Sequence, residues 1–317
     1  MANAIKTYFD FSQLSMAAYA SLSPGSPSTI ALTGAGFSTP LANQFVSTNN
    51  GYEVRSVSPS DDPLSFGFSA TLLEKLDSSN RTGQFTLAIR GTNDAADILI
   101  DAVSIAILGS ENLNPQYSAL KRYVDSLTAE GGILFNKTYS VTGHSLGGFL
   151  AQALATDATY ASQIDKVYTY NAPGFGGAVT SLLNALGISN PLVGSVPVGK
   201  VTNFVASNGL SPIAGLGQHI GDVQQVFIQD GTPLNDHSII TLTDSLALYS
   251  LFEKIDPTTV TVPSLTAILN AASNAPERSL GSTLDALRQL FQLNHLTFVA
   301  TPPFRSLDSD VTNRNTY

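Results

Sequence analysis

Lys-Thr-Tyr-Ser-Val-Thr-Gly-His-Ser-Leu-Gly-Gly, residues 137–148, is the stretch that decides the fold of this 317-residue chain. The β-forming residues before Gly143 predict a strand, and the small and aliphatic residues 149–155 predict a helix. Gly143 and Gly147 allow a sharp turn between the two, which leaves Ser145 strained at the start of the helix. Helix N–H groups stabilise negative charge on a substrate oxygen, so this pattern predicts a nucleophilic serine.

Short β-rich runs alternate with helical spans on both sides of this turn. The clearest runs are 85–89, 166–171, 201–206 and 225–228. Such an alternation is typical of a parallel sheet with right-handed crossovers. With the G-x-S-x-G turn, it predicts an α/β-hydrolase, a mostly parallel sheet flanked by helices. We expect one such domain over residues 1–250, and a helical C-terminal extension packed on it over 251–317.

Composition narrows the possible partners and the compartment. The formal charge is −9 and no run of lysine or arginine is present, which argues against a nucleic-acid partner. The chain has no cysteine, so disulfides and cysteine metal sites are excluded. It also lacks a stretch of about 20 apolar residues, so no transmembrane segment is predicted. Only 12% of residues are charged, which favours a secreted bacterial protein, although Met1–Phe11 shows no signal peptide.

A serine nucleophile needs a base, and four histidines are available. We predict His237, because it follows the last predicted strand and comes after the nucleophile in chain order. His219, in a glycine-rich stretch, is the alternative. His144 is expected to pack beneath the turn, pointing away from Ser145, and His295 lies far downstream.

Four motifs resemble those of the class 3 lipases, which include fungal triacylglycerol lipases and bacterial phospholipase A1-like enzymes. They are Ile-Arg-Gly-Thr at 89–92, the elbow at 143–148, Tyr-Asn-Ala-Pro at 170–173 and Asp-His-Ser at 236–238. The similarity extends from about residue 85 to 249. It implies that the backbone N–H groups of Thr92 and Leu146 form the oxyanion hole. It also implies a lid over 95–108, an apolar stretch that would otherwise be a core helix.

The acid of the triad departs from the family pattern. The resemblance places it after the strand at 201–206, yet no aspartate or glutamate occurs between Asp165 and Asp222. Asn208 stands at about the expected position, and an asparagine orients a histidine without offsetting its positive charge. Asp222 and Asp230 are the two alternatives. Asp236 is disfavoured because neighbouring side chains of an extended loop point apart.

These observations predict a serine ester hydrolase that cleaves triacylglycerol or phospholipid through an acyl-enzyme and contacts a lipid interface transiently. Alternatives are a phospholipase A1 or polyester hydrolase of the same mechanism, or a catalytically weakened relic that binds lipid or protein. No cofactor is expected. A structural calcium is possible, although no EF-hand spacing is present. The C-terminal region resembles the segment that precedes calcium-binding repeats in secreted bacterial lipases. This resemblance implies that the chain is the N-terminal module of such a lipase.

Overall fold

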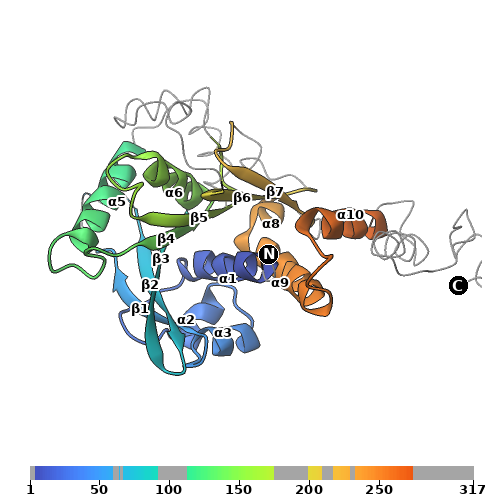
Figure 1. Ribbon diagram of the computed structural model, residues 1–317, viewed down its shortest axis with the longest axis horizontal. Coiled ribbons are helices and arrows are strands. Elements are labelled where there is room, and N and C mark those ends of the chain that lie inside the picture. The colour runs from blue at the N-terminus through green and yellow to red at the C-terminus, as the bar shows by residue number, and fades with distance from the viewer. Residues whose placement is uncertain are drawn as a thin grey trace, which may run out of the picture.

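The computed structural model describes residues 4–59, 64, 67–91, 113–174, 199–208, 217–228 and 233–273. These residues form a seven-stranded sheet in which spatial order follows chain order. The first two pairings are antiparallel and the four from β3 onward are parallel, which confirms the predicted mostly parallel sheet (Figure 1). The strands are β1 Tyr52–Val57, β2 Ala70–Asp77, β3 Asn80–Ile89, β4 Tyr139–His144, β5 Ile164–Tyr170, β6 Val201–Ala206 and β7 Asp222–Val226.

Helices cover both faces of this sheet, with α6 on one face and α1 and α9 on the other (Figure 1). The sheet centre is therefore shielded on both sides, and the strands there are apolar runs; residues 85–89 of β3 are all buried. The described helices are α1 Ala4–Ala17, α2 Thr29–Gly34, α3 Thr39–Phe45, α5 Leu113–Thr128, α6 Leu146–Thr156, α8 Pro233–His237, α9 Ile239–Ile255 and α10 Val262–Ser273.

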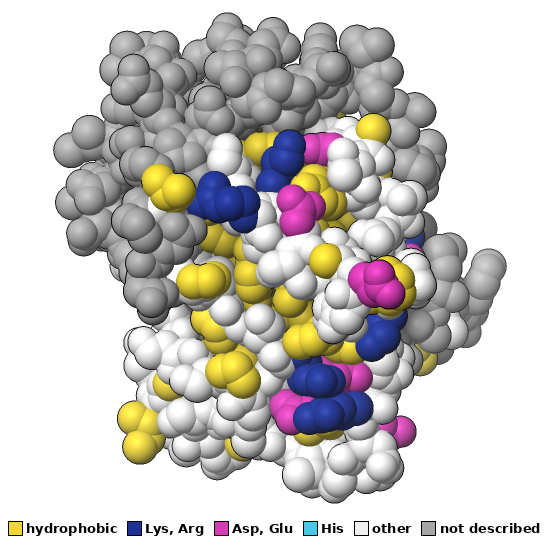
Figure 2. Space-filling model, turned by 90° about the vertical axis from the view of Figure 1, so that its left-hand side faces the viewer, with side chains coloured by type: hydrophobic (Ala, Val, Ile, Leu, Met, Phe, Trp, Pro, Cys, Tyr) yellow, Lys and Arg dark blue, Asp and Glu magenta, His cyan; other side chains and the backbone are white. Residues whose placement is uncertain are grey.

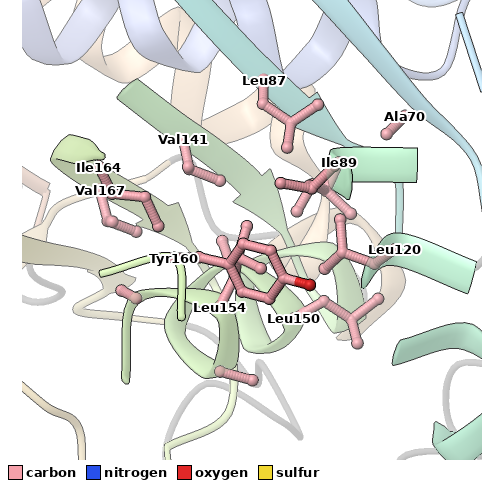
Figure 3. Close-up of a cluster of buried hydrophobic side chains, with 14 of the residues drawn as sticks. Ala70, Leu87, Ile89, Leu120, Val141, Leu150, Leu154, Tyr160, Ile164 and Val167 are labelled. Carbon is pink, nitrogen blue, oxygen red and sulfur yellow. The ribbon is translucent and has the colours of Figure 1, made fainter. Parts of the chain in front are cut away.

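One hydrophobic core lies between the sheet and the helices α5 and α6. Figure 3 shows Leu87, Ile89 and Val141 of the sheet facing Leu150 and Leu154 of α6. These side chains are at most 1% exposed. Burial of this kind contributes about 1.5–3 kcal/mol for each large aliphatic side chain, and it fixes α6, and thus its first residue, on the sheet.

The opposite face carries a second core, in which α1 and α9 pack on the sheet and on each other. The side of α1 that faces inward includes small residues such as Ser12, Ser15 and Ala17, all fully buried. Small side chains let two helices approach closely, which explains how a helix at residue 4 and one at residue 239 form a single layer.

Acidic and basic side chains lie side by side, with hydrophobic ones between them, on the face shown in Figure 2. Across β1, β2 and β3, Arg81 Nε lies 2.7 Å from Glu53 Oε2, and Arg55 pairs with the buried Glu74. The Arg81 guanidinium lowers the pKa of the Glu53 carboxyl. Exposed ion pairs such as Arg81–Glu53 add little stability. The buried Glu74 also accepts the Gly83 N–H at 2.9 Å, and this hydrogen bond closes the β2–β3 turn.

The expected domain boundary at residue 250 falls inside α9, which continues unbroken to Ile255 and packs on α1 along its length. The next helix, α10, begins at Val262 and contacts β7. Residues 274–317 lie outside the described residues. Within the part of the chain that the structure describes, the C-terminal helices therefore belong to the same folded unit as the sheet.

Glu253, on α9, joins the two ends of this unit. Its carboxylate is 4% exposed and accepts the N–H groups of Ile5 at 2.9 Å and Lys6 at 2.8 Å. These are first-turn donors of α1, which have no acceptor within their own helix. A carboxylate at a helix N-terminus also interacts favourably with the helix dipole.

We expect Glu253→Ala to lower the free energy of unfolding by about 2–3 kcal/mol, because two buried N–H groups lose a charged acceptor. Urea denaturation followed by circular dichroism measures this loss. Glu130→Ala, at an exposed position, is the control and should change stability by less than about 0.5 kcal/mol. Equal effects of the two substitutions would show that the carboxylate does not stabilise α1.

Candidate active site

Ser145 occupies a strained turn between β4 and α6. Its φ of 56° and ψ of −128° lie outside the regions that side chains other than glycine prefer. Three hydrogen bonds hold this conformation: the Ser145 N–H donates to Tyr170 O at 3.0 Å, and Ser145 O accepts from Gly148 and Phe149 at 3.0 and 3.1 Å. The strand, sharp turn and helix predicted around Ser145 are thus present, and Ser145 is only 1% exposed.

Glycines around the elbow let three backbone segments meet. A Cβ on Gly147 would lie 2.2 Å from Ile89 O, and one on Gly143 would lie 2.4 Å from the Gly147 carbonyl carbon. A Cβ on Gly91 would lie 2.6 Å from His144 O. Distances this short exclude any side chain, so the end of β3 lies directly against the turn that carries Ser145.

His237 lies next to this turn. It ends the short helix α8, is 1% exposed, and its ring centroid is 4.8 Å from that of His144. Its carbonyl oxygen accepts from His144 Nε2 at 2.7 Å and from Asn171 Nδ2 at 3.1 Å. A residue 92 positions downstream is thus held against the residue before Ser145. The backbone of His237 is thus held close to the turn that carries Ser145.

The other two histidines are elsewhere. His219 is half-buried, and its backbone lies against Gly174, in the loop that follows β5. His295 lies outside the described residues. His144 packs beneath the turn, as expected, but it does so through hydrogen bonds at both ring nitrogens.

Burial keeps both imidazoles of this site neutral at pH 7. Desolvation lowers the pKa of His144 to about 4, partly offset by its hydrogen bond to the His237 carbonyl. Desolvation and the neighbouring His144 also lower the pKa of His237. A neutral imidazole is the form that accepts a proton, so His237 is in the state that a general base requires.

The same shifts predict that folding stability declines in mild acid. The unfolded chain binds protons on these histidines near pH 6.5, whereas the folded chain resists them until about pH 4 for His144. Their contribution is therefore complete above pH 6.5 and is lost as the pH falls toward 4. We expect the free energy of unfolding to fall by up to about 1.4 kcal/mol per pH unit for each imidazole. Urea denaturation between pH 7.5 and 5 measures the slope, which should be shallower in His144→Phe; an unchanged slope would contradict this assignment.

Asn208, predicted at the position of the acid, forms two hydrogen bonds to a backbone segment. Asn208 Nδ2 donates to Ile228 O at 2.6 Å, and Asn208 Oδ1 accepts the Ile228 N–H at 2.8 Å. The amide therefore joins the loop after β6 to the loop after β7. The two hydrogen bonds form a bracket between two backbone segments. An asparagine can form this bracket and an aspartate cannot, because the bracket needs both a donor and an acceptor.

Asp222 is also poorly placed to act as the acid. It is exposed and forms the first residue of β7, where it pairs with Thr202. In a parallel sheet the chemistry gathers at the carboxyl ends of the strands, where β4 delivers Ser145, and Asp222 begins its strand. The roles of Asp222 and Asn208 in the triad stay predictions, which these positions disfavour.

Several predicted residues lie outside the described part of the chain: Thr92, Asp230 and the expected lid at 95–108. Their roles stay predictions. Leu146 is described, and it is the first residue of α6. Its N–H belongs to the first helical turn, whose donors have no acceptor within the helix, and so it remains a candidate for the oxyanion hole.

Two residues of the site escaped the sequence analysis. Tyr19, just after α1, bonds to His144 and to Gly91. Asn171 is fully buried, donates to the carbonyls of Asp236 and His237, and accepts the Ala206 N–H at 3.0 Å. The Tyr-Asn-Ala-Pro motif marks Asn171, whereas nothing in the sequence near Tyr19 connects it with a histidine 125 residues away.

Within the described ranges, no group of three or more histidine, aspartate or glutamate side chains is arranged to hold a metal ion. Of the helices that the structure describes, none has the length and apolar character needed to span a bilayer. A structural calcium stays a sequence prediction.

No protein-family model matches the chain, and a search of curated proteins finds no match. Among solved structures, the chain is similar to Lip2 lipase from Yarrowia lipolytica, at 20% identity and a TM-score of 0.43, covering 71% of this chain and 80% of that one. It is similar to a lipase from Rhizopus microsporus var. chinensis, at 18% identity and a TM-score of 0.40, and this match covers 65% of this chain and 67% of that one. It is also similar to lipase II from Rhizopus niveus, at 16% identity and a TM-score of 0.38, and this match covers 65% of this chain and 72% of that one.

Proposed function

We propose that the chain is a serine ester hydrolase that cleaves carboxylic esters of lipids through an acyl-enzyme. The observation that carries this proposal is a strained serine on an elbow, with the backbone of a buried, neutral histidine bonded to the residue before that serine. A serine is a poor nucleophile at its ordinary pKa, and an adjacent imidazole that accepts its proton activates it.

The proposed reaction has two halves. The Ser145 oxygen attacks the ester carbonyl carbon while its proton passes to His237, and the carbonyl oxygen becomes an oxyanion held by the N–H groups of Leu146 and Thr92. The carbon–oxygen bond to the alcohol then breaks, and the alcohol leaves with the proton from His237. Water, deprotonated by His237, attacks the acyl-enzyme, releases the carboxylic acid and restores Ser145.

The proposed acid is Asp230, the remaining member of the alternatives once Asn208 and Asp222 are disfavoured. It follows Ile228 by two residues and precedes His237 by seven. A carboxylate that accepts from the imidazole stabilises the imidazolium that forms when Ser145 loses its proton.

The proposed substrates are triacylglycerols or phospholipids, outside the cell. The apolar sequence at 95–108 supports a lipid substrate, and the low content of charged residues supports secretion. A panel of p-nitrophenyl esters of increasing chain length, assayed beside a triacylglycerol emulsion, phospholipid vesicles and a polyester film, tests the class of substrate. A fluorophosphonate probe tests the nucleophile, because it labels only an activated serine. Absence of both labelling and turnover on every ester would overturn the proposed function.

A further inference from the structure

A chain of hydrogen bonds joins three segments of the candidate site. The Gly91 N–H donates to Tyr19 Oη at 3.1 Å, Tyr19 Oη lies 2.8 Å from His144 Nδ1, and His144 Nε2 lies 2.7 Å from His237 O. The chain thus begins one residue before Thr92, passes beneath Ser145 and ends on the backbone of His237. It connects the proposed oxyanion turn, the elbow and the proposed base.

The donor at each step follows from the chemistry of the two ends. A carbonyl oxygen only accepts, so His144 Nε2 carries the hydrogen. A neutral imidazole has one N–H, so His144 Nδ1 is the acceptor and the Tyr19 hydroxyl donates to it. An amide N–H only donates, so the Tyr19 oxygen accepts from Gly91. One tautomer of one neutral histidine satisfies every group in the chain.

The end of the chain is fixed by a second side chain. Asn171 Nδ2 donates to His237 O at 3.1 Å, and also to Asp236 O at 3.1 Å. The His237 carbonyl therefore accepts from both His144 and Asn171, which fills the two lone pairs of its oxygen. Because this carbonyl is held from two sides, the position of the His237 backbone is fixed, and with it the position of the Cα atom that carries the imidazole.

We propose that His144 and Tyr19 are positioning residues of the proposed reaction, which hold the His237 backbone and the start of the oxyanion turn in place relative to Ser145. This inference rests on the proposed function. His144 contacts no reacting atom in this assignment. It acts through the carbonyl of His237, and Tyr19 acts through His144 and Gly91.

The effect of positioning on rate is large, because a displacement of about 1 Å between reacting groups costs about 10²-fold. Removing the donor on His144 leaves one lone pair of the His237 carbonyl unfilled and lets α8 shift. Removing the Tyr19 hydroxyl takes away the acceptor of the Gly91 N–H and the donor to His144 Nδ1. Both changes act on the same chain, so their effects should not add.

Nitrogen NMR of the wild-type protein, labelled with ¹⁵N-histidine, tests the chain without reference to activity. The signals of His144 are those missing from His144→Gln. We expect the neutral tautomer with hydrogen on Nε2, stable from pH 8 to 5. The Nδ1–H tautomer, or a mixture in exchange, would overturn the assigned direction and with it the positioning role.

Steady-state kinetics on esters tests the role itself. We expect Tyr19→Phe and His144→Phe to lower kcat by about 10- to 100-fold with KM within about twofold, since the chemical step and not substrate binding is affected. His144→Gln keeps a side-chain donor toward His237 O and should recover part of the loss. The double variant should be no slower than the slower single one. Tyr117→Phe, which removes another buried hydroxyl, bonded to Asp157 on the opposite face, is the matched control and should keep wild-type kcat.

Fluorophosphonate titration counts folded active sites, so that a loss of folded protein is not mistaken for a loss of rate. If His144→Phe and Tyr19→Phe, counted in this way, turn over esters at the wild-type rate, the positioning role fails and the proposed function stands. Additive losses in the double variant would also overturn it. If the wild-type protein itself neither reacts with the probe nor turns over ester, the proposed function fails, which is a different outcome from failure of the positioning role alone.

Discussion

Ser145→Ala is expected to abolish ester hydrolysis, lowering kcat by about 10⁴-fold or more, because the acyl-enzyme forms on the Ser145 oxygen and nothing replaces it. The fold should persist: Ser145 is held by its backbone N–H and carbonyl, which alanine retains. The positive φ of 56° is already a cost that the wild-type residue bears. Turnover of a short-chain p-nitrophenyl ester, normalised to folded protein, measures the loss.

Ser140→Ala is the matched control, since Ser140 lies five residues earlier, on the strand β4 that leads to Ser145, and is only partly buried. It should retain wild-type turnover and wild-type labelling by a fluorophosphonate. Residual turnover in Ser145→Ala equal to that of Ser140→Ala would mean that another group performs the hydrolysis. In that case the strained elbow would need a different explanation.

Asp230→Asn is expected to lower kcat/KM by about 10⁴-fold, the loss that follows from exchanging the acid of a serine triad for its amide. The physical reason is that His237 becomes positively charged when it takes the serine proton. An amide neither offsets that charge nor holds the imidazole in the correct tautomer. Initial rates on a short-chain ester, with matched circular dichroism spectra, measure this effect.

Asn208→Ala is the informative comparison. It removes the bracket on Ile228 and should lower the free energy of unfolding by about 1–3 kcal/mol through two lost hydrogen bonds to backbone groups. Its effect on kcat/KM should stay within about tenfold. A loss of about 10³-fold or more in Asn208→Ala, together with near wild-type rates in Asp230→Asn, would exchange the two assignments.

The sheet and the elbow were predictable because their signals are local. Gly143, Gly147 and the β-rich run before them specify the turn within a dozen residues, and close backbone contact at both glycines explains why the signal is strong. The strands β3, β5 and β6 were visible as short β-rich runs, whereas the buried strand β2 was not predicted. The helices α2 and α3 were not predicted, because glycine, proline and asparagine punctuate that stretch.

The supporting contacts of the site were not predictable, because they join residues far apart in the chain. Tyr19 and His144 are 125 residues apart, and Asn171 reaches His237 across 66. Asn208 illustrates the opposite error: its position in the chain fits the acid, but its amide faces a backbone segment 20 residues away. Residue type and chain order locate a candidate, whereas the hydrogen-bond partner assigns its task.

The strand order of the sheet has a consequence for how the protein is made. Each strand pairs with its predecessor in the chain, so the sheet can grow as the polypeptide leaves the ribosome, without waiting for distant partners. The first helix is the exception, because its companion α9 and the carboxylate of Glu253 are synthesised about 240 residues later. Until then the side of α1 that packs on α9 stays uncovered, and the nascent protein exposes apolar surface there.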